Sequence, residues 1–298
     1  MRALHSQRDL PLSAIDEKLR DPAFLDLHLA AIGALARIGE PRWYDSHFLR
    51  RYEAAKLYLA EVRPDALDDF ITGFDPLRPS PDFEVIPVEN LFDHATHDHI
   101  REIARSIPEA QIERHENAAF GRHVVHDHAV FVELQEQVQP RVEEIVGRDL
   151  EAGYNFLSLY GPSGVCDLHM DEPLSMYTLD YCIEQSHDWP IAFSNVVDWP
   201  DAEAMREWTP DTVLNDPKIR FEERSLRENN ALIFAGSSQW HHRRPIPRGG
   251  FCNLLFFHYF PAGCEGLVWP HLWADHFGVP ELQAFCDLVP SDERKPVR

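Results

Sequence analysis

Apolar residues near the start of the chain recur at helical spacing. Leu25, Leu29 and Ile32 follow one another at intervals of a helical turn, and similar repeats continue, so we predict helices between residues 12 and about 72. A proline-rich run, Asp75-Pro76-Leu77-Arg78-Pro79-Ser80-Pro81, comes next. Because proline lacks the amide donor that a helix requires, this run is expected to end the helical part.

Beyond the proline-rich run, the pattern changes to two further helices and a series of short strands. One helix is predicted over residues 94–106 and another over about 130–146, where Pro140 should kink or split the helix. The predicted strands cover residues 83–88, 154–160, 167–171, 176–183, 190–195, 231–235 and 251–260. Many short strands after helices indicate an α+β fold, with helices packed on a barrel-like double sheet.

These elements divide the chain into three expected parts. They are a helical N-terminal extension over residues 1–80, a core over residues 81–262, and a C-terminal tail over residues 263–298 that packs on the core. Residues 197–227, rich in Trp, Pro and charge, interrupt the strands of the core. This insertion is either a lid over a site or a loop that lies only on the surface.

Composition restricts the partners of the protein. The formal net charge of -22 disfavours binding to nucleic-acid phosphates and to anionic membranes. The five cysteines form no CxxC pair, which is typical of a reduced compartment. The first residues are too polar for a signal-peptide core, and no apolar run is long enough to span a bilayer. We expect a cytoplasmic protein that binds neither nucleic acid nor membrane; a homodimer stays open.

The chemistry-bearing motif is His169-Met170-Asp171. On an extended chain, positions i and i+2 point to the same face, so His169 and Asp171 are suited to hold one ion. A third ligand is expected from Trp240-His241-His242, which follows an apolar strand and a glycine. Because the chain contains 17 histidines, the motif alone is weak. Two His and one carboxylate with open positions are typical of non-heme Fe(II) oxygenases.

With these pieces in this order, residues 83–261 resemble the Fe(II)/2-oxoglutarate-dependent oxygenases, especially the branch that includes prolyl-hydroxylase-like enzymes. In that family a Tyr-containing strand and a Gly turn lead to HxD, and a later strand leads to the distal His and a final strand. The corresponding pieces are Tyr160, His169-Met170-Asp171, Ala231–Phe234, His241 and Phe251–Tyr259. The resemblance implies a double-stranded β-helix, the jelly-roll or cupin-like barrel, that binds Fe(II), 2-oxoglutarate and O2.

The resemblance also bears on the third metal ligand and on the reaction type. The run His241-His242-Arg243-Arg244-Pro245, followed by Leu254-Leu255-Phe256-Phe257-His258-Tyr259, looks like the ending of some bacterial members, and this favours His241 over His242 as the ligand. Halogenating members replace the carboxylate with a small residue. Because Asp171 is present here, hydroxylation or desaturation is favoured over halogenation.

The anchor for 2-oxoglutarate is less clearly marked. The family usually holds the far carboxylate with an Arg or Lys about ten residues after the distal His, but Phe251-Cys252-Asn253 occupy that region. An Arg suits this role because its planar fork matches a carboxylate. We rank Arg243 and Arg248 nearly level, with Arg244 behind them, and expect Tyr160 as the other contact.

The implied enzyme hydroxylates an unactivated C–H bond of a small molecule, such as an amino acid or a natural-product intermediate, and releases succinate and CO2. One alternative is the same chemistry on a protein or peptide side chain. Another alternative is a cupin-like protein that binds a metal or ligand without oxygenase activity.

Overall fold

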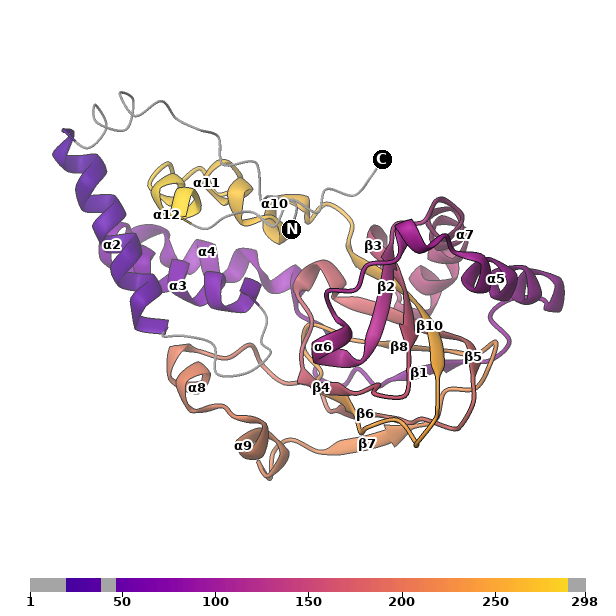
Figure 1. The fold of residues 1–298 in the computed structure, drawn as a ribbon. Coiled ribbons are helices and arrows are strands. Elements are labelled where there is room, and N and C mark those ends of the chain that lie inside the picture. Colours follow the sequence, from indigo (N-terminus) through magenta and orange to yellow (C-terminus); the bar gives the residue numbers. More distant parts are fainter. Residues whose placement is uncertain (1–19, 39–46, 289–298) are drawn as a thin grey trace.

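Two antiparallel sheets form the centre of the protein, in a computed structural model that describes residues 20–38 and 47–288. The strands are β1 (Ile86–Val88), β2 (Arg122–His126), β3 (Leu150–Tyr160), β4 (Cys166–His169), β5 (Tyr177–Gln185), β6 (Ile191–Ser194), β7 (Phe221–Arg224), β8 (Ala231–Phe234), β9 (His241–Arg243) and β10 (Cys252–Pro261). The larger sheet has six strands in the order β1-β8-β5-β10-β3-β2, and the smaller has four in the order β4-β9-β6-β7 (Figure 1).

The mixture of helices and antiparallel strands confirms the α+β class expected from the sequence. The seven predicted strands are present with shifted ends; β3, for example, begins at Leu150 rather than at residue 154. The predictions missed β2, β7 and β9. Strand β7 reads Phe-Glu-Glu-Arg, and β9 has only three residues, so neither carries the apolar alternation that identifies a strand.

Two helices, α5 (His94–Ser106) and α7 (Ala129–Val146), cover the outer face of the larger sheet. Leu255 and Phe257 of β10 pack into the apolar cluster that these helices form with the sheet. The expected split at Pro140 does not occur, because α7 continues through this residue as one helix. The long buried contact with the sheet stabilises the helix on both sides of the proline.

The opposite face of the larger sheet packs against the smaller sheet. Alternate residues of β10, Leu254 and Phe256, belong to this inner cluster together with Tyr160 of β3. Phe193 of the smaller sheet meets Phe234 of the larger sheet, with ring centroids 4.8 Å apart. The space between the two sheets is therefore the interior of the protein. Polar residues on the inner faces of the sheets point into the same space.

The helices from the two ends of the chain lie together on one side of the sheets, and we call them the helical layer (Figure 1). They are α2 (Pro22–Ile38), α3 (His47–Val62), α4 (Leu67–Gly73), α10 (Glu265–Val268), α11 (Trp273–His276) and α12 (Leu282–Leu288). Phe48 meets Trp273 edge to face at 5.7 Å, and the Tyr58 hydroxyl donates to the Glu281 carbonyl at 2.8 Å. The C-terminal segment thus packs largely on the N-terminal helices. Residues 1–19, 39–46 and 289–298 of the two predicted end segments lie outside the described residues.

The helical layer also supports the smaller sheet. Leu168, Met170 and Trp240 belong to the same apolar cluster as the helices. These three residues alternate in sequence with His169 and His241. Because neighbouring residues of an extended chain point in opposite directions, the packing of one set fixes the direction of the other.

Helix α2 presents a different face to the layer than its sequence suggests. Leu25, Leu29 and Ile32, which mark the predicted apolar stripe, are exposed. The buried face carries Ala31 and Ala34, small residues that allow α2 to approach its neighbours closely. The helix is apolar on more than one side, so periodicity alone did not identify the packed face.

The insertion at residues 197–227 is attached to the helical layer. Its short helices are α8 (Ala202–Glu207) and α9 (Pro210–Leu214), and a further short helix, α6 (Asn117–Phe120), precedes β2. Trp199 is part of the apolar cluster of the layer, and the Ala202 amide donates to Glu53 Oε1 at 3.1 Å. The insertion therefore rests on the layer through both apolar and polar contacts.

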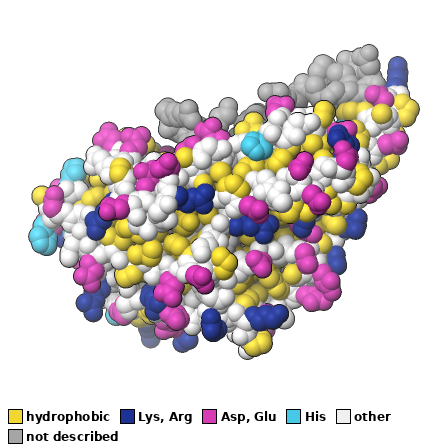
Figure 2. All heavy atoms as spheres, turned by 180° about the vertical axis from the view of Figure 1, so that it is seen from behind, with side chains coloured by type: hydrophobic (Ala, Val, Ile, Leu, Met, Phe, Trp, Pro, Cys, Tyr) yellow, Lys and Arg dark blue, Asp and Glu magenta, His cyan; other side chains and the backbone are white. Residues whose placement is uncertain are grey.

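The surface mixes charges of both signs. Figure 2 shows acidic and basic side chains interspersed on the face seen from behind, with hydrophobic side chains between them. On this face the acidic excess is not gathered into one block. Within residues 20–38 and 47–288, no helix combines the length and apolar character needed to cross a bilayer.

Candidate metal centre

Strand pairing places two histidines side by side. His169 ends β4, and His241 begins β9 directly opposite it in the antiparallel pair. Residues that face each other in this way project on the same side of the sheet. Their imidazole centroids are 4.2 Å apart.

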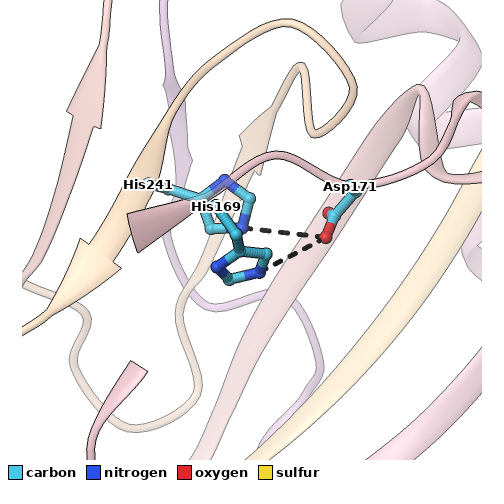
Figure 3. A group of neighbouring side chains, drawn as sticks. All are labelled: His169, Asp171 and His241. Carbon is cyan, nitrogen blue, oxygen red and sulfur yellow. Dashed lines mark ion pairs between the residues drawn. The ribbon is translucent and has the colours of Figure 1, made fainter. Parts of the chain in front are cut away.

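Asp171 completes the group from the loop after β4. The Asp171 amide donates to the Gly236 carbonyl at 2.8 Å, which ties this loop to the one between β8 and β9. Asp171 Oδ1 lies 3.6 Å from His169 Nε2 and 3.8 Å from His241 Nε2 (Figure 3). The three potential ligand atoms all lie within 4.8 Å of one another.

No other group of three or more His, Cys, Asp or Glu side chains in the described ranges meets the same criterion for holding a metal ion. The histidines at positions 123, 126 and 128, which the sequence places close together, do not form such a group. His126 Nδ1 instead faces Glu113 Oε1 at 2.9 Å on the surface.

The Nδ1 atoms of both imidazoles form hydrogen bonds with backbone carbonyl groups. His169 Nδ1 lies 2.7 Å from the Asp167 carbonyl oxygen, and His241 Nδ1 lies 3.0 Å from the Gln239 carbonyl oxygen. A carbonyl oxygen only accepts, so each Nδ1 carries a proton and donates it. In both rings Nε2 is therefore the nitrogen left for a metal, and it points toward Asp171, which is the arrangement that a metal ligand requires.

Burial and mutual proximity shift the pKa values of the three groups. Burial would raise the pKa of Asp171, but the adjacent His241 and His169 outweigh it, and the pKa lies well below its usual range. Burial, together with nearby His169, lowers the pKa of His241 to about 3. Burial opposes the charged form of His169 too, but Cys166 and Asp171 outweigh it and raise this pKa. Without metal, the group holds an anionic Asp171, a neutral His241 and a proton on His169.

The side chain of Asp171 is the most accessible of the three. It is 18% exposed, compared with 10% for His169 and 5% for His241. Phe234 and Phe193 pack beside the His241 ring, with centroids 4.9 and 6.1 Å away. A ligand is therefore expected to approach past Asp171, while aromatic side chains exclude water behind His241.

His242 points away from this group. It pairs with Ala192 of β6, and its half-buried ring packs against Phe221 at 5.6 Å. The adjacent residue on a strand faces the opposite side of the sheet, so only one of the two histidines can join Asp171. The structure brings His241 into the group.

The expected anchor residues occupy different environments. Arg243 is buried, and its Nη2 lies 2.7 Å from Asp180 Oδ2 while its Nη1 donates to the Trp189 carbonyl at 2.6 Å. Arg243 is also directly opposite Cys166 in the strand pairing, near His169. Arg248 is exposed in the turn before β10.

Tyr160 lies in the interior between the sheets. Its hydroxyl accepts a hydrogen bond from Arg122 Nη1 at 2.9 Å, and Arg122 also contacts Glu116. The Arg122 guanidinium stacks over the Phe156 ring at 5.1 Å. Arg122 thus brings a second guanidinium beside the expected cosubstrate residue, although it carried no signal in the sequence.

Solved structures with a similar course of the backbone were found. HygX from Streptomyces hygroscopicus with nickel and 2-oxoglutarate bound is 14% identical; the match covers 65% of this chain and 86% of that one, with a TM-score of 0.46. The non-heme alpha ketoglutarate dependent carbocyclase SnoK from nogalamycin biosynthesis is 11% identical, with coverages of 63% and 83% and a TM-score of 0.49. A Pseudomonas putida prolyl-4-hydroxylase is 9% identical, with coverages of 60% and 94% and a TM-score of 0.43.

The similarity is one of fold alone. No protein-family model and no curated protein matches the chain. Among the matching structures, HygX was solved with 2-oxoglutarate bound, and SnoK is described as alpha ketoglutarate dependent. At these low identities, the chemistry of this chain rests on its own side chains.

Sequence reasoning assigned no role beside Asp171 to three residues that lie around it. Thr178 of β5 lies 3.3 Å from Asp171 Oδ2, and His258 of β10 lies 3.0 Å from Thr178 Oγ1. Gly236 packs against the carboxylate itself. A glycine directly after the apolar strand Ala231–Phe234 was visible in the sequence, but only the fold reveals that it faces Asp171.

Proposed function

We propose that this chain is a non-heme iron enzyme that uses 2-oxoglutarate and O2, with His169, Asp171 and His241 as its iron ligands. One observation carries the proposal. Two imidazole Nε2 atoms and one carboxylate oxygen converge from β4, the following loop and β9. Two His and one carboxylate on one side of an ion leave its other positions to a cosubstrate and O2.

The proposed fold assignment is a double-stranded β-helix, also called a jelly roll. Strands β3, β5, β8 and β10 lie in one sheet, and the intervening β4, β6, β7 and β9 lie in the other. A chain that alternates in this way between two facing sheets supports the assignment. The proposed metal ligands then lie on the inner side of the smaller sheet.

The donor set fits a divalent metal. Both histidines direct Nε2 at the site, and both Nδ1 atoms are held by backbone carbonyls. Asp171 stays ionised because its pKa is lowered by its histidine neighbours, and a metal ion would displace the proton that His169 carries without metal. Iron, nickel and zinc all accept imidazole nitrogen and carboxylate oxygen. The preference for iron comes from the composition of two His and one carboxylate.

The interior also fits a polar cosubstrate. Among the described residues, three buried polar atoms have no hydrogen-bond partner on or near the inner face of the larger sheet: Ser158 Oγ, Asp180 Oδ1 and His258 Nε2. Buried polar atoms in proteins are nearly always paired, so these atoms favour a polar ligand between the sheets. The carboxylates and keto group of 2-oxoglutarate only accept, so among these atoms the Ser158 hydroxyl can donate to it, whereas Asp180 Oδ1 and His258 Nε2 require a donor such as water or a substrate hydroxyl.

We propose Tyr160 and Arg243 as contacts of the cosubstrate, with Arg248 as the alternative anchor. The Tyr160 hydroxyl accepts from Arg122, which leaves its own proton for a ligand oxygen. Arg243 is buried two residues after His241, and its planar fork has more donors than its two bonded partners use. Arg248 is less suited because it is exposed.

When bound, Fe(II), 2-oxoglutarate and O2 supply the oxidation of an unactivated C–H bond, with release of succinate and CO2. The protein's own contribution is to hold and orient these groups. His169, His241 and Asp171 fix three positions around the metal, and the aromatic rings beside His241 keep bulk water away. The favoured reaction is hydroxylation of a small molecule.

A direct test measures succinate formed from 2-oxoglutarate in the presence of Fe(II), ascorbate and O2, together with anaerobic binding of 2-oxoglutarate by calorimetry. We expect binding that depends on the metal and slow turnover even without a primary substrate. The Asp171→Ala variant serves as the control and should lack both. If the wild-type protein binds no 2-oxoglutarate with metal present, the proposal is wrong, and a metal- or ligand-binding role without oxygenase activity takes its place.

A further inference from the structure

The two oxygens of Asp171 have different neighbours. Oδ1 faces the two imidazole Nε2 atoms at 3.6 and 3.8 Å. Oδ2 lies 3.3 Å from the hydroxyl of Thr178, and this hydroxyl lies 3.0 Å from His258 Nδ1. A chain of contacts therefore connects the carboxylate, through Thr178, to a third histidine that is not itself part of the ligand group.

We propose that Thr178 and His258 position Asp171, so that Oδ1 rather than Oδ2 is presented to the metal. His258 is then a positioning residue that acts through Thr178. The inference rests on the proposed metal site, and it adds two residues that neither the sequence nor the comparisons assign. Carboxylate ligands are commonly oriented by hydrogen bonds of this kind, and these bonds affect metal affinity.

The direction of the hydrogen bonds follows from charge. Asp171 is ionised and only accepts, so it is the stronger acceptor for the single hydroxyl proton of Thr178. The oxygen of Thr178 is then free to accept from His258 Nδ1–H. Burial lowers the pKa of His258 to about 4, which keeps this ring neutral at pH 7. With its proton on Nδ1, the ring has a bare Nε2, and no described residue donates to that atom.

The fold holds the His258 ring firmly. Tyr154 stacks on it with centroids 4.2 Å apart, and Phe156 lies 5.5 Å away at a small interplanar angle. The pairing of β3 with β10 shifts between Phe257 and Tyr259, so that Gly153 and Tyr154 together oppose His258. A bulge of this kind redirects a side chain, and here it brings Tyr154 over the imidazole.

The unpaired Nε2 argues against a purely structural role. A buried nitrogen without a partner destabilises the folded protein, whereas a phenyl ring would stack on Tyr154 and Phe156 without this cost. In the protein without a bound ligand, the hydrogen bond that only imidazole supplies at this position is the one from Nδ1 to Thr178. Replacing His258 with Phe should therefore separate packing from positioning.

The test compares Thr178→Val and His258→Phe with Thr178→Ser, which keeps the hydroxyl. Three quantities are measured for each: the Kd for Co(II) by titration, the visible absorption spectrum of bound Co(II), and the Tm of the metal-free protein. We expect Thr178→Val and His258→Phe to lose about ten- to a hundred-fold in affinity and to change the Co(II) spectrum, with no decrease in Tm for His258→Phe. Thr178→Ser should stay close to the wild type.

Two results would overturn the inference. One is a wild-type Kd and Co(II) spectrum in both Thr178→Val and His258→Phe. The other is a loss of affinity in His258→Phe that accompanies a lower Tm and leaves the Co(II) spectrum unchanged, because that pattern indicates a structural role. Co(II) binding by the wild type and by Asp171→Ala distinguishes failure of this inference from failure of the metal site. A wild-type protein that binds no Co(II) refutes the metal site itself.

Discussion

Gly236 lies so close to Asp171 that a β-carbon at position 236 would come within 2.5 Å of the carboxylate oxygen Oδ2. The same β-carbon would lie 2.6 Å from the Ser175 carbonyl oxygen, which is backbone and cannot turn aside. We expect Gly236→Ala to displace Asp171 and to weaken metal binding by at least about ten-fold, as loss of a positioning contact does. Titration with Co(II) measures this change.

Gly33 provides the matched control for this substitution. It lies on an exposed face of α2, where an added β-carbon would meet nothing within 4 Å. Gly33→Ala should leave metal affinity unchanged and stabilise the protein by up to about 1 kcal/mol, because alanine favours the helix. Wild-type metal affinity in Gly236→Ala would show that the carboxylate can move without loss.

The two adjacent histidines should differ sharply in their importance. His241→Ala removes a group that faces Asp171, so we expect loss of metal binding and of 2-oxoglutarate turnover. His242→Ala should retain both, because this ring packs on Phe221 at the other face of the strand. The measurement is metal-dependent succinate formation by each variant. Equal loss in both variants would contradict the assignment of His241.

Two of the metal ligands were accessible to sequence reasoning because their geometry is local, and the choice of His241 as the third came from the family resemblance. The i, i+2 relation of His169 and Asp171 follows from an extended backbone, and His241 follows an apolar strand and a glycine turn. Thr178 carried no signal in the sequence, and His258 stood there only as part of the run that resembles the family ending, with no role beside Asp171. They meet Asp171 only because β5 pairs with β10, with Thr178 directly opposite His258, and this register depends on the whole sheet.

For the helices, too, the sequence predicted the element but not the residues that it packs against. The periodic pattern in α2 located a helix correctly, but Leu25 and Leu29 are exposed while Ala31 is buried. The face that packs depends on how closely the neighbouring helices approach, which the spacing of apolar residues does not encode. The attachment of the C-terminal segment to the N-terminal helices is also a long-range contact, formed for example by Tyr58 and Glu281.

The buried pair of Arg243 and Asp180 should respond differently to single and double substitution. Arg243→Met leaves Asp180 as an unpaired charge in the interior, and we expect a loss of about 3–5 kcal/mol in the free energy of unfolding. Arg243→Met combined with Asp180→Leu should recover most of this stability, because two apolar side chains replace the whole pair. Denaturant unfolding of the three proteins measures the effect.

The double variant also tests the cosubstrate anchor. If Arg243 holds a carboxylate of 2-oxoglutarate, the folded double variant should still bind Fe(II). It should bind 2-oxoglutarate at least about ten-fold more weakly, as expected for loss of a charge-assisted pair. Arg248→Ala is the matched control, since Arg248 is exposed and its removal should not affect folding. Weaker 2-oxoglutarate binding in Arg248→Ala, with normal binding in the double variant, would assign the anchor to Arg248 instead.

Metal binding should become tighter as the pH rises. In the metal-free protein, burial disfavours the charged form of His169, but Cys166 and Asp171 outweigh burial and raise its pKa well above 6.5. A proton therefore occupies the ligand group at neutral pH, and a metal ion must displace it. Titrations with Co(II) between about pH 6 and pH 9 should show rising affinity, with protons released on binding in calorimetry with buffers of different ionisation enthalpy.

The stability of the metal-free protein should change in the opposite sense. Because the pKa of His169 is higher in the folded than in the unfolded state, its contribution to stability is complete below about pH 6.5 and is lost as the pH rises through the raised value. The Tm without metal should therefore decrease on the alkaline side, while the increase in Tm on adding Co(II) should grow there. A His169→Gln variant, which has no titrating group at this position, should lose both trends. If the metal-induced increase in Tm is the same at all pH values, His169 carries no proton that the metal displaces.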